Sequence, residues 1–261
     1  FLRTIWAEFS RLHSHLLWLG LLADAFGFES LFMQSWKVRE KVLDIMEETT
    51  GGRVIFGSCK IGGVRKDIDP VTLKRMGKIL SELEKDIKEI SNVFLNEYTV
   101  KRRLIGVGVL SKEDAYTLGA VGPMMRASGI AQDMRKLGYG AYPELDFEPI
   151  TRTNGDSYDR CSVRIEELFQ SIDLIRQAID KIPEGPVETK VTGNPDGEAF
   201  VRLEQPRGEV VYYVKGNGTK FLDRLRVRTP TFANIPALLK MLKGCDYADV
   251  PILILTIDPC I

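Results

Sequence analysis

The sequence contains few of the residues from which metal sites and disulfide frameworks are built. Its 261 residues include two histidines and four cysteines, Cys59, Cys161, Cys245 and Cys260, and no Cys-x-x-Cys pair. This scatter, without a secretory signal, disfavours a disulfide scaffold and favours a reducing, cytoplasmic compartment. We expect the first three cysteines to be small buried side chains.

The sequence also lacks an excess of charge of either sign and lacks a long apolar run. Lysine plus arginine and aspartate plus glutamate each number 36, which gives no reason to expect nucleic acid as a partner. The run LHSHLLWLGLLA ends at Asp24, well short of the roughly 20 residues that span a bilayer. With 44% hydrophobic residues, we expect a soluble globular chain without a transmembrane segment.

Apolar periodicity of three and four residues is the strongest structural signal. It predicts long amphipathic helices over residues 2–24, 35–51, 71–97 and 156–183. Ser111 with Asp114 resembles a capping box and predicts a shorter helix from that point.

The C-terminal part has a different pattern. Residues 197–230 alternate β-branched and aromatic residues on both sides of a GNGT turn, which predicts a β-hairpin. Residues 232–244 return to helical periodicity, with Pro236 expected in the first turn. Residues 249–259 form a short apolar segment that Pro259 ends. The fold class is therefore α+β and mostly α, a bundle of long helices with a small β-hairpin element.

Two short stretches place chemically useful side chains in rigid settings. In EQPRGE, Pro206 fixes the backbone and Gly208 permits a close neighbour, so Arg207 is held in place, although a surface arginine is the alternative. In IDPC, a proline turn presents Cys260 beside Asp258, and a thiolate suits nickel, iron or copper. One cysteine is not a site, and a second nearby ligand would have to lie beyond Ile261.

The order and separation of six stretches resemble one protein family. They are similar to the large subunit of nickel–iron hydrogenases, and more closely to the membrane-associated, energy-converting group related to the 49-kDa subunit of respiratory complex I. The resemblance runs through nearly the whole chain and rests on FLRTIWAEFSRLHSHLLWLG, REKVLDIMEETTGGR, IGGVRKDI, EQPRGEVVYYVKGNG, RVRTPTFANIP and ILTIDPC.

The resemblance implies a function and partners. It implies reversible heterolysis of H2 at a nickel–iron centre, with electrons passed to an iron–sulfur cluster in a partner small subunit. It also implies membrane subunits of an energy-converting complex as partners, and a peripheral location on the cytoplasmic face of the membrane. The fold would be that of the hydrogenase large subunit.

The resemblance also assigns roles to individual residues around the centre. Cys260 matches a terminal thiolate on nickel, and Asp258 matches an aspartate that lies next to the metal ligands. Arg207 matches the arginine over the metal where hydrogen is split, and a guanidinium can stabilise charge there without titrating. Pro230 and Thr231 match positions near the same pocket.

Other assignments concern electron and proton transfer. Arg65, in GGVR, matches a segment that faces the small subunit's cluster, although a turn arginine in an ion pair is the alternative. His13 and His15 point about 200° apart on one helix and therefore cannot share a metal. His15 and Asp24 are candidates for a proton path, with a satisfied core histidine as the alternative for His15.

Two departures from the family pattern bear on the metal centre. The N-terminal Cys-x-x-Cys pair is absent, and the C-terminal pair stops after Cys260. We expect this chain to be truncated at both ends, free of the nickel–iron centre, mobile at its ends and inactive by itself. We divide it into a helical body, 1–183, and a part with the hairpin, C-terminal helix and metal-ligand turn, 184–261, within one continuous fold.

Two other functions remain open. A complex I-type subunit, part of an NADH:quinone oxidoreductase, would keep the fold and bind quinone in the equivalent cavity. Arg207 is compatible with both, and Cys260 favours the hydrogenase because a quinone-binding relative needs no thiol there. The third possibility is a cofactor-free scaffold subunit.

Overall fold

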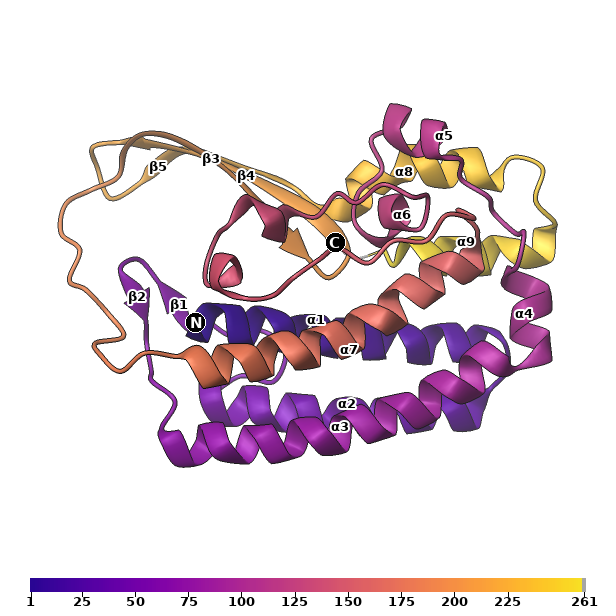
Figure 1. Ribbon diagram of the computed structural model, residues 1–261. Coiled ribbons are helices and arrows are strands. Elements are labelled where there is room, and N and C mark those ends of the chain that lie inside the picture. The colour runs from indigo at the N-terminus through magenta and orange to yellow at the C-terminus, as the bar shows by residue number, and fades with distance from the viewer. Residues whose placement is uncertain (260–261) are drawn as a thin grey trace.

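Four long helices form the body of the molecule. The computed structural model describes residues 1–259. The four helices are α1 (Leu2–Ala25), α2 (Glu29–Thr50), α3 (Pro70–Asn96) and α7 (Ser157–Lys181). Figure 1 shows α1 and α7 in one layer and α2 and α3 beneath them. α1 packs against α2 and α7, and α3 packs against the same two helices. The predicted mostly α, α+β fold is confirmed.

Local capping explains where these helices begin and end. Asp69 accepts hydrogen bonds from two backbone N–H groups in the first turn of α3, and Asp156 accepts one from the backbone N–H of Asp159 in the first turn of α7. Gly51 ends α2 in the left-handed conformation. α2 begins at Glu29, before the predicted Ser35, and Ser35 lies inside the helix pair, where its hydroxyl donates to the carbonyl of Leu16.

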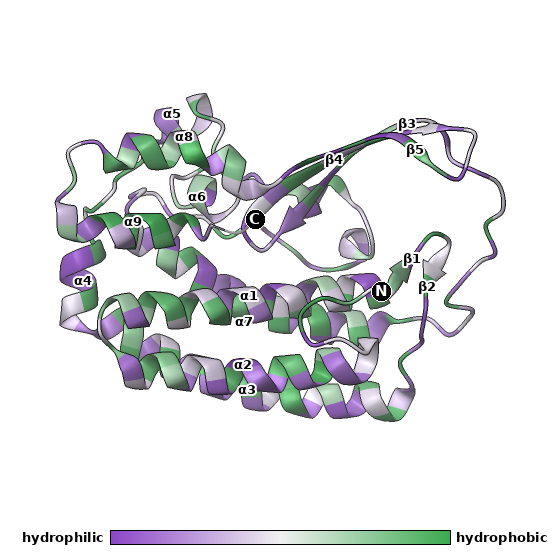
Figure 2. Ribbon diagram, turned by 180° about the vertical axis from the view of Figure 1, so that it is seen from behind, coloured by the Kyte–Doolittle hydropathy of each residue, from purple (hydrophilic) through white to green (hydrophobic). Residues whose placement is uncertain are grey.

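The main hydrophobic core lies between the long helices. The apolar stripe predicted on the first helix is fully buried at Ile5, Phe9, Leu12, Leu16 and Leu19. Figure 2 shows polar and apolar residues interspersed along the long helices and apolar residues over most of α9. Burial of this stripe is the main force that holds α1 in the centre of the bundle.

The chain between α3 and α7 consists of short elements. Ser111 accepts a hydrogen bond from the backbone N–H of Asp114 at 3.0 Å, which confirms the predicted capped helix. The elements are α4 (Tyr98–Leu104), α5 (Lys112–Thr117), α6 (Pro123–Arg126) and the 3-10 helices η1 (Met134–Leu137) and η2 (Tyr142–Glu144).

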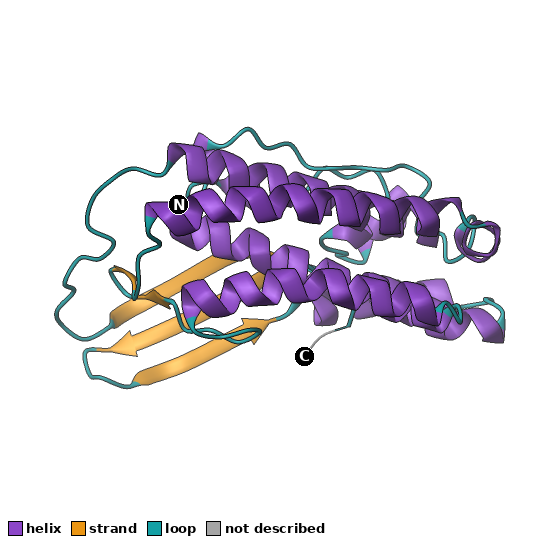
Figure 3. Cartoon of the chain, turned by 90° about the horizontal axis from the view of Figure 1, so that it is seen from below, coloured by secondary structure: helices purple, strands orange, loops and turns teal. Residues whose placement is uncertain are grey.

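A three-stranded antiparallel sheet projects from one side of the bundle (Figure 3). Its strands are β3 (Asp196–Gln205), β4 (Gly208–Asn217) and β5 (Leu222–Arg228), paired in that order. The predicted hairpin is β4–β5. A second turn at 206–207 adds β3, which the sequence did not predict because a proline there also suits the end of a strand. A separate two-stranded ribbon, β1 (Cys59–Lys60) and β2 (Gly63–Val64), lies between α2 and α3 in the sequence.

The C-terminal segment is helical. α8 (Pro230–Leu242) is followed by η3 (Tyr247–Asp249) and α9 (Val250–Ile257). The expectation that Pro236 lies in the first turn of its helix is wrong, because Pro230 fills that turn and Pro236 lies inside α8.

A second hydrophobic cluster joins this segment to the middle of the chain. It includes Leu110, Met124, Leu238, Leu253 and Ile257. These residues come from both sides of position 183, and the division of the chain there stays a prediction. Among residues 1–259, no helix is long and apolar enough to cross a bilayer.

Candidate functional site

The turn between β3 and β4 carries Arg207. Gln205 and Gly208 face each other across the two strands, so Pro206 and Arg207 alone make the turn. A side-chain carbon added at Gly208 would lie 2.8 Å from the Cα atom of Gly122. The prediction that Gly208 permits a close backbone neighbour is therefore confirmed.

Arg207 joins three segments that are far apart in the sequence. Its Nε donates to the backbone carbonyl of Asp258 at 2.9 Å and lies 3.2 Å from a carboxylate oxygen of the same residue. Its Nη1 donates to the hydroxyl of Ser14 on α1 at 2.9 Å. The side chain is 17% exposed. Two of the predicted site residues, Arg207 and Asp258, are thus in direct contact.

Asp258 has an unusual backbone and an unsatisfied oxygen. It is the one non-glycine residue of positive φ in the described chain, at 54°, directly after α9. Its side chain is buried, and Oδ2 has no hydrogen-bond partner among the described residues. Burial raises the pKa of Asp258, against the opposing effect of Arg207 and Arg164. A buried oxygen without a donor is uncommon and marks this place as a candidate site.

Side chains from other helices hold the last turn of α9. Trp18 Nε1 donates to the carbonyl of Leu255 at 2.7 Å, and Arg164 Nη2 donates to the carbonyl of Thr256 at 2.8 Å. The guanidinium of Arg164 lies over the Trp18 ring at 4.7 Å. Carbonyls at the end of a helix need such donors, and cations are favoured there. The end of α9 is therefore held by side chains from α1 and α7.

The two histidines have separate partners. His15 is fully buried, and its Nε2 lies 2.8 Å from a carboxylate oxygen of Glu167. Burial lowers the pKa of His15 to about 4, against the opposing effect of Glu167. His13 lies 2.7 Å from Arg39, and burial together with that arginine lowers its pKa to about 4. The two histidines thus contact different side chains.

The remaining predicted residues lie on other elements. Arg65 is exposed, and its Nε donates to the carbonyl of Gly57 at 2.7 Å. Asp24 is exposed near the end of α1. Pro230 and Thr231 are buried in the first turn of α8. Within the described chain, no hydrogen bond or ion pair connects Arg65 or Asp24 to the arginine of the β3–β4 turn.

The thiols do not form a cluster in the described part of the chain. Cys260 lies outside the described residues. Cys161 is buried, which raises its pKa to about 12, whereas the prediction of burial is wrong for Cys59, which β1 exposes. Among residues 1–259, no group of three His, Cys, Asp or Glu side chains is arranged to hold a metal ion. Arg207 and the free oxygen of Asp258 fit the surroundings of a nickel–iron centre, but the described residues do not supply its thiolates.

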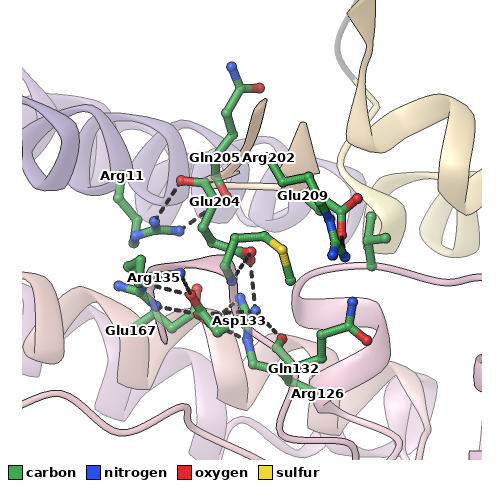
Figure 4. A network of polar contacts seen from close by, with 12 residues as sticks. Arg11, Arg126, Gln132, Asp133, Arg135, Glu167, Arg202, Glu204, Gln205 and Glu209 are labelled. Atoms are coloured by element: carbon green, nitrogen blue, oxygen red, sulfur yellow. Dashed lines mark hydrogen bonds and ion pairs between the residues drawn. The ribbon is translucent and has the colours of Figure 1, made fainter. Parts of the chain in front are cut away.

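A buried ionic network that the sequence did not predict surrounds Glu204 near the end of β3, and Figure 4 shows most of its residues. It joins α1, α6, η1, α7 and the end of β3, and none of its charged residues is more than 6% exposed. These residues are Glu8, Arg11, Arg126, Asp133, Arg135, Glu167 and Glu204.

This network holds the strand that leads into the turn. Arg126 pairs with Glu167 and with Glu204, each at 2.7 Å. Arg11 donates to the backbone carbonyls of Glu204 and Gln205 at 3.3 and 3.2 Å. Arg126 lowers the pKa of Glu167 well below its ordinary value although burial acts in the opposite direction. The backbone next to Pro206 is therefore fixed by buried charges.

The spacing of polar residues along two helices was the feature of the sequence that could have predicted this network. Glu8, Arg11 and His15 follow one another at intervals of three and four on α1. On α7, Arg164 and Glu167 are three apart. Such intervals place side chains on one face of a helix, here next to the apolar stripe. The sequence prediction singled out only His15 from this set.

A family model and several known proteins match most of this chain. The family model described as "Respiratory-chain NADH dehydrogenase, 49 Kd subunit" matches residues 25–194 and 189–261. These segments include Asp258 and Arg207 and cover most of the chain.

Several known proteins are similar over the whole chain. A membrane-bound hydrogenase subunit alpha of Pyrococcus furiosus is 38% identical, over 100% of this chain and 65% of the relative. A carbon monoxide-induced hydrogenase of Rhodospirillum rubrum is 39% identical, over 100% of this chain and 73% of the relative. The C/D subunit of an NADH-quinone oxidoreductase of Bacteroides fragilis is 39% identical, over 96% of this chain and 48% of the relative.

The chain spans about two thirds of the hydrogenase relatives and half of the C/D subunit. All three relatives are subunits or enzymes of the oxidoreductase class. The matching family model covers more than half of the chain. The chain therefore belongs to the family of the 49-kDa subunit of respiratory-chain NADH dehydrogenase, and it is similar throughout to a subunit of a membrane-bound hydrogenase.

Proposed function

We propose that the chain is the main part of the catalytic large subunit of a multisubunit nickel–iron hydrogenase that splits and forms H2. The observation that carries the proposal is the contact of Arg207 with Asp258, two residues before Cys260. The similarity to two proteins named as hydrogenases supports it.

The residues of this chain would organise the surroundings of the metal. The centre itself, when bound, would supply the heterolysis of H2, with Cys260 as one of its thiolate ligands. Arg207 would present a permanent positive charge, because a guanidinium does not titrate and Ser14 and Asp258 fix its orientation. The first turn of α8, with Pro230 and Thr231, would lie beside the same metal centre.

Electrons and protons would leave by separate routes. Arg65 is exposed and would face the iron–sulfur cluster of a partner small subunit, where its charge would tune the cluster potential. His15 and Asp24 are the proposed proton-path residues. Membrane subunits would hold the complex on the cytoplasmic face of the membrane.

The test is hydrogen turnover by the purified complex that contains the full-length chain. Arg207→Lys keeps the charge but loses the fork that reaches Asp258 and Ser14, so H2-dependent dye reduction should fall roughly 100-fold. Arg202→Lys, on β3 just before the turn and 40% exposed, is the control and should retain activity. Full H2 turnover in the Arg207→Lys complex would overturn the assigned role of this arginine.

A quinone-reducing function is the second candidate. The description of the matching family and the similarity to the C/D subunit favour it. In that case the intact complex would reduce quinone with NADH and would neither consume nor produce H2. A complex with neither activity would support the scaffold alternative.

A further inference from the structure

α9 ends in a backbone turn that glycine usually makes. Asp258 follows the helix with φ 54° and ψ 64°, in the left-handed region. A residue with a side chain enters this region at a cost, and glycine is the common residue directly after a helix. The backbone N–H of Asp258 donates to the carbonyl of Leu255 at 2.9 Å. Contacts around the turn are therefore needed to hold its conformation.

Two carbonyls at the end of α9 accept hydrogen bonds from neighbouring helices. Trp18 on α1 donates to the carbonyl of Leu255 at 2.7 Å, and Arg164 on α7 donates to that of Thr256 at 2.8 Å. Because a peptide unit is planar, a held carbonyl fixes the orientation of the whole unit. These two units lie on either side of the Cα atom of Thr256. The two bonds therefore determine the backbone angles of the next-to-last residue of α9.

A third carbonyl is held on the other side of the turn. Arg207 Nε donates to the carbonyl of Asp258 at 2.9 Å, which fixes the peptide unit between Asp258 and Pro259. The chain is thus held before and after the left-handed residue, by side chains of three separate segments. Together these bonds set the direction in which the chain leaves α9.

Arg164 is used in an unusual way for a buried arginine. Its side chain is fully buried, and no carboxylate among residues 1–259 lies in ion-pair contact with it. A buried guanidinium is commonly paired with a carboxylate, as Arg126 is with Glu167. Arg164 donates instead to two backbone carbonyls, that of Arg160 in its own helix at 3.2 Å and that of Thr256. Within the described chain, its hydrogen bonding beyond α7 is directed at the end of α9.

Trp18 and Arg164 also fix each other. Trp18 is 1% exposed, and the guanidinium of Arg164 lies over its ring at 4.7 Å. A cation over an aromatic face is attracted to it, most strongly where water is excluded. The two donors therefore form one rigid unit behind the end of α9.

We propose that Trp18 and Arg164 are positioning residues that set the approach of the chain to Cys260, so that the metal-ligand turn has its direction before a metal binds. Cys260 lies outside the described residues, two positions after Asp258. A ligand that is already oriented loses less conformational freedom on binding, so the metal is held more tightly. The inference rests on the proposed hydrogenase function, because it concerns a thiolate ligand of that centre.

The first measurement is hydrogen exchange in the complex with the full-length chain, purified from cells grown without nickel. We expect the backbone N–H groups of residues 255–258 to be protected in the wild type. Trp18→Phe keeps an aromatic ring beside Arg164 and removes the donor, so exchange in this turn should be about tenfold faster. Arg164→Met removes the other donor without leaving a carboxylate unpaired, and the same increase is expected.

The second measurement is the nickel content of the same complexes from cells supplied with nickel. We expect Trp18→Phe and Arg164→Met to lose most of the nickel. Trp6→Phe is the matched control, because Trp6 lies on the same helix, is 1% exposed, and donates from Nε1 to the hydroxyl of Thr49 on α2 at 3.2 Å. It also removes a buried indole N–H, and it should retain nickel and the protection of residues 255–258.

Three results would overturn this inference alone. The first is fast exchange of residues 255–258 in the nickel-free wild type, which would mean that the metal forms the turn, and this measurement needs no variant. The second is nickel at the wild-type level in both Trp18→Phe and Arg164→Met. The third is an equal loss of nickel in Trp6→Phe, which would indicate a general effect of lost stability. A wild-type complex without nickel would instead overturn the proposed hydrogenase function, and the role of both residues with it.

Discussion

At the scale of single residues, the cost of burying charge decides which side chains contribute most to stability. Arg207 and Asp258 were found from the sequence, because short motifs with proline and glycine mark rigid turns. Glu8, Arg126 and Glu204 were not, because their burial depends on contacts between segments more than 70 residues apart. The partner of a buried charged residue can therefore be identified only once the fold is known.

Removal of Glu167 should be strongly destabilising. Glu167→Ala leaves Arg126 buried without one of its two carboxylate partners at 2.7 Å, so the free energy of unfolding should fall by about 3–5 kcal/mol. Glu166→Ala is the matched control, because Glu166 pairs with Arg152 at the surface and should cost at most about 1 kcal/mol. Urea denaturation measures both, and equal losses would contradict the assigned strength of the buried network.

At the scale of elements, close backbone contacts decide where the site can form. Gly208, the first residue of β4, was predicted to permit a close neighbour. Its partner, Gly122, was not predicted, since no pattern in the sequence pairs the two segments. The three-stranded sheet and the early start of α8 were missed for a related reason, because Pro206 and Pro236 each fit more than one position in an element.

Gly208→Ala should separate the β3–β4 turn from Gly122. The new methyl group would lie 2.8 Å from the Cα atom of Gly122, and the cost should be about 1–3 kcal/mol above the strain of a positive φ. Gly185→Ala is the control, because Gly185 has a φ of 148° against 127° at Gly208 and open space around it, so this variant measures the cost of the positive φ without a close contact. Unfolding free energies that agree for the two variants would contradict the close contact.

At the scale of the whole molecule, the sequence predicted the bundle and not the contacts across it. Each long helix carries its own periodic stripe, so the four helices were predictable from local patterns. The second hydrophobic cluster joins residues near 110–125 to α8 and α9, and no local pattern reports that pairing. The buried network lies between these two apolar regions and holds the end of β3.

The stability of the molecule should depend on pH in two opposite ways. The folded pKa of Glu167 lies below the ordinary value of 4.5, so its contribution is present above that value and is lost as pH falls. The raised pKa of Glu204 contributes stability below 4.5, and this is lost as pH rises through its folded pKa. Glu204→Gln should therefore remove the loss of stability that follows as pH rises above 4.5, and keep the loss as pH falls. Thermal unfolding as a function of pH measures both, and an unchanged loss on raising the pH in the variant would contradict the account.

The most direct test of the central claim is the nickel content of the purified complex that contains the full-length chain. The account predicts stoichiometric nickel in the wild type and its loss in Cys260→Ser, with nickel retained in Cys245→Ser, a cysteine outside the IDPC turn. A wild-type complex that is complete in its subunits and contains no nickel would contradict the proposed hydrogenase function and favour the quinone-reducing one.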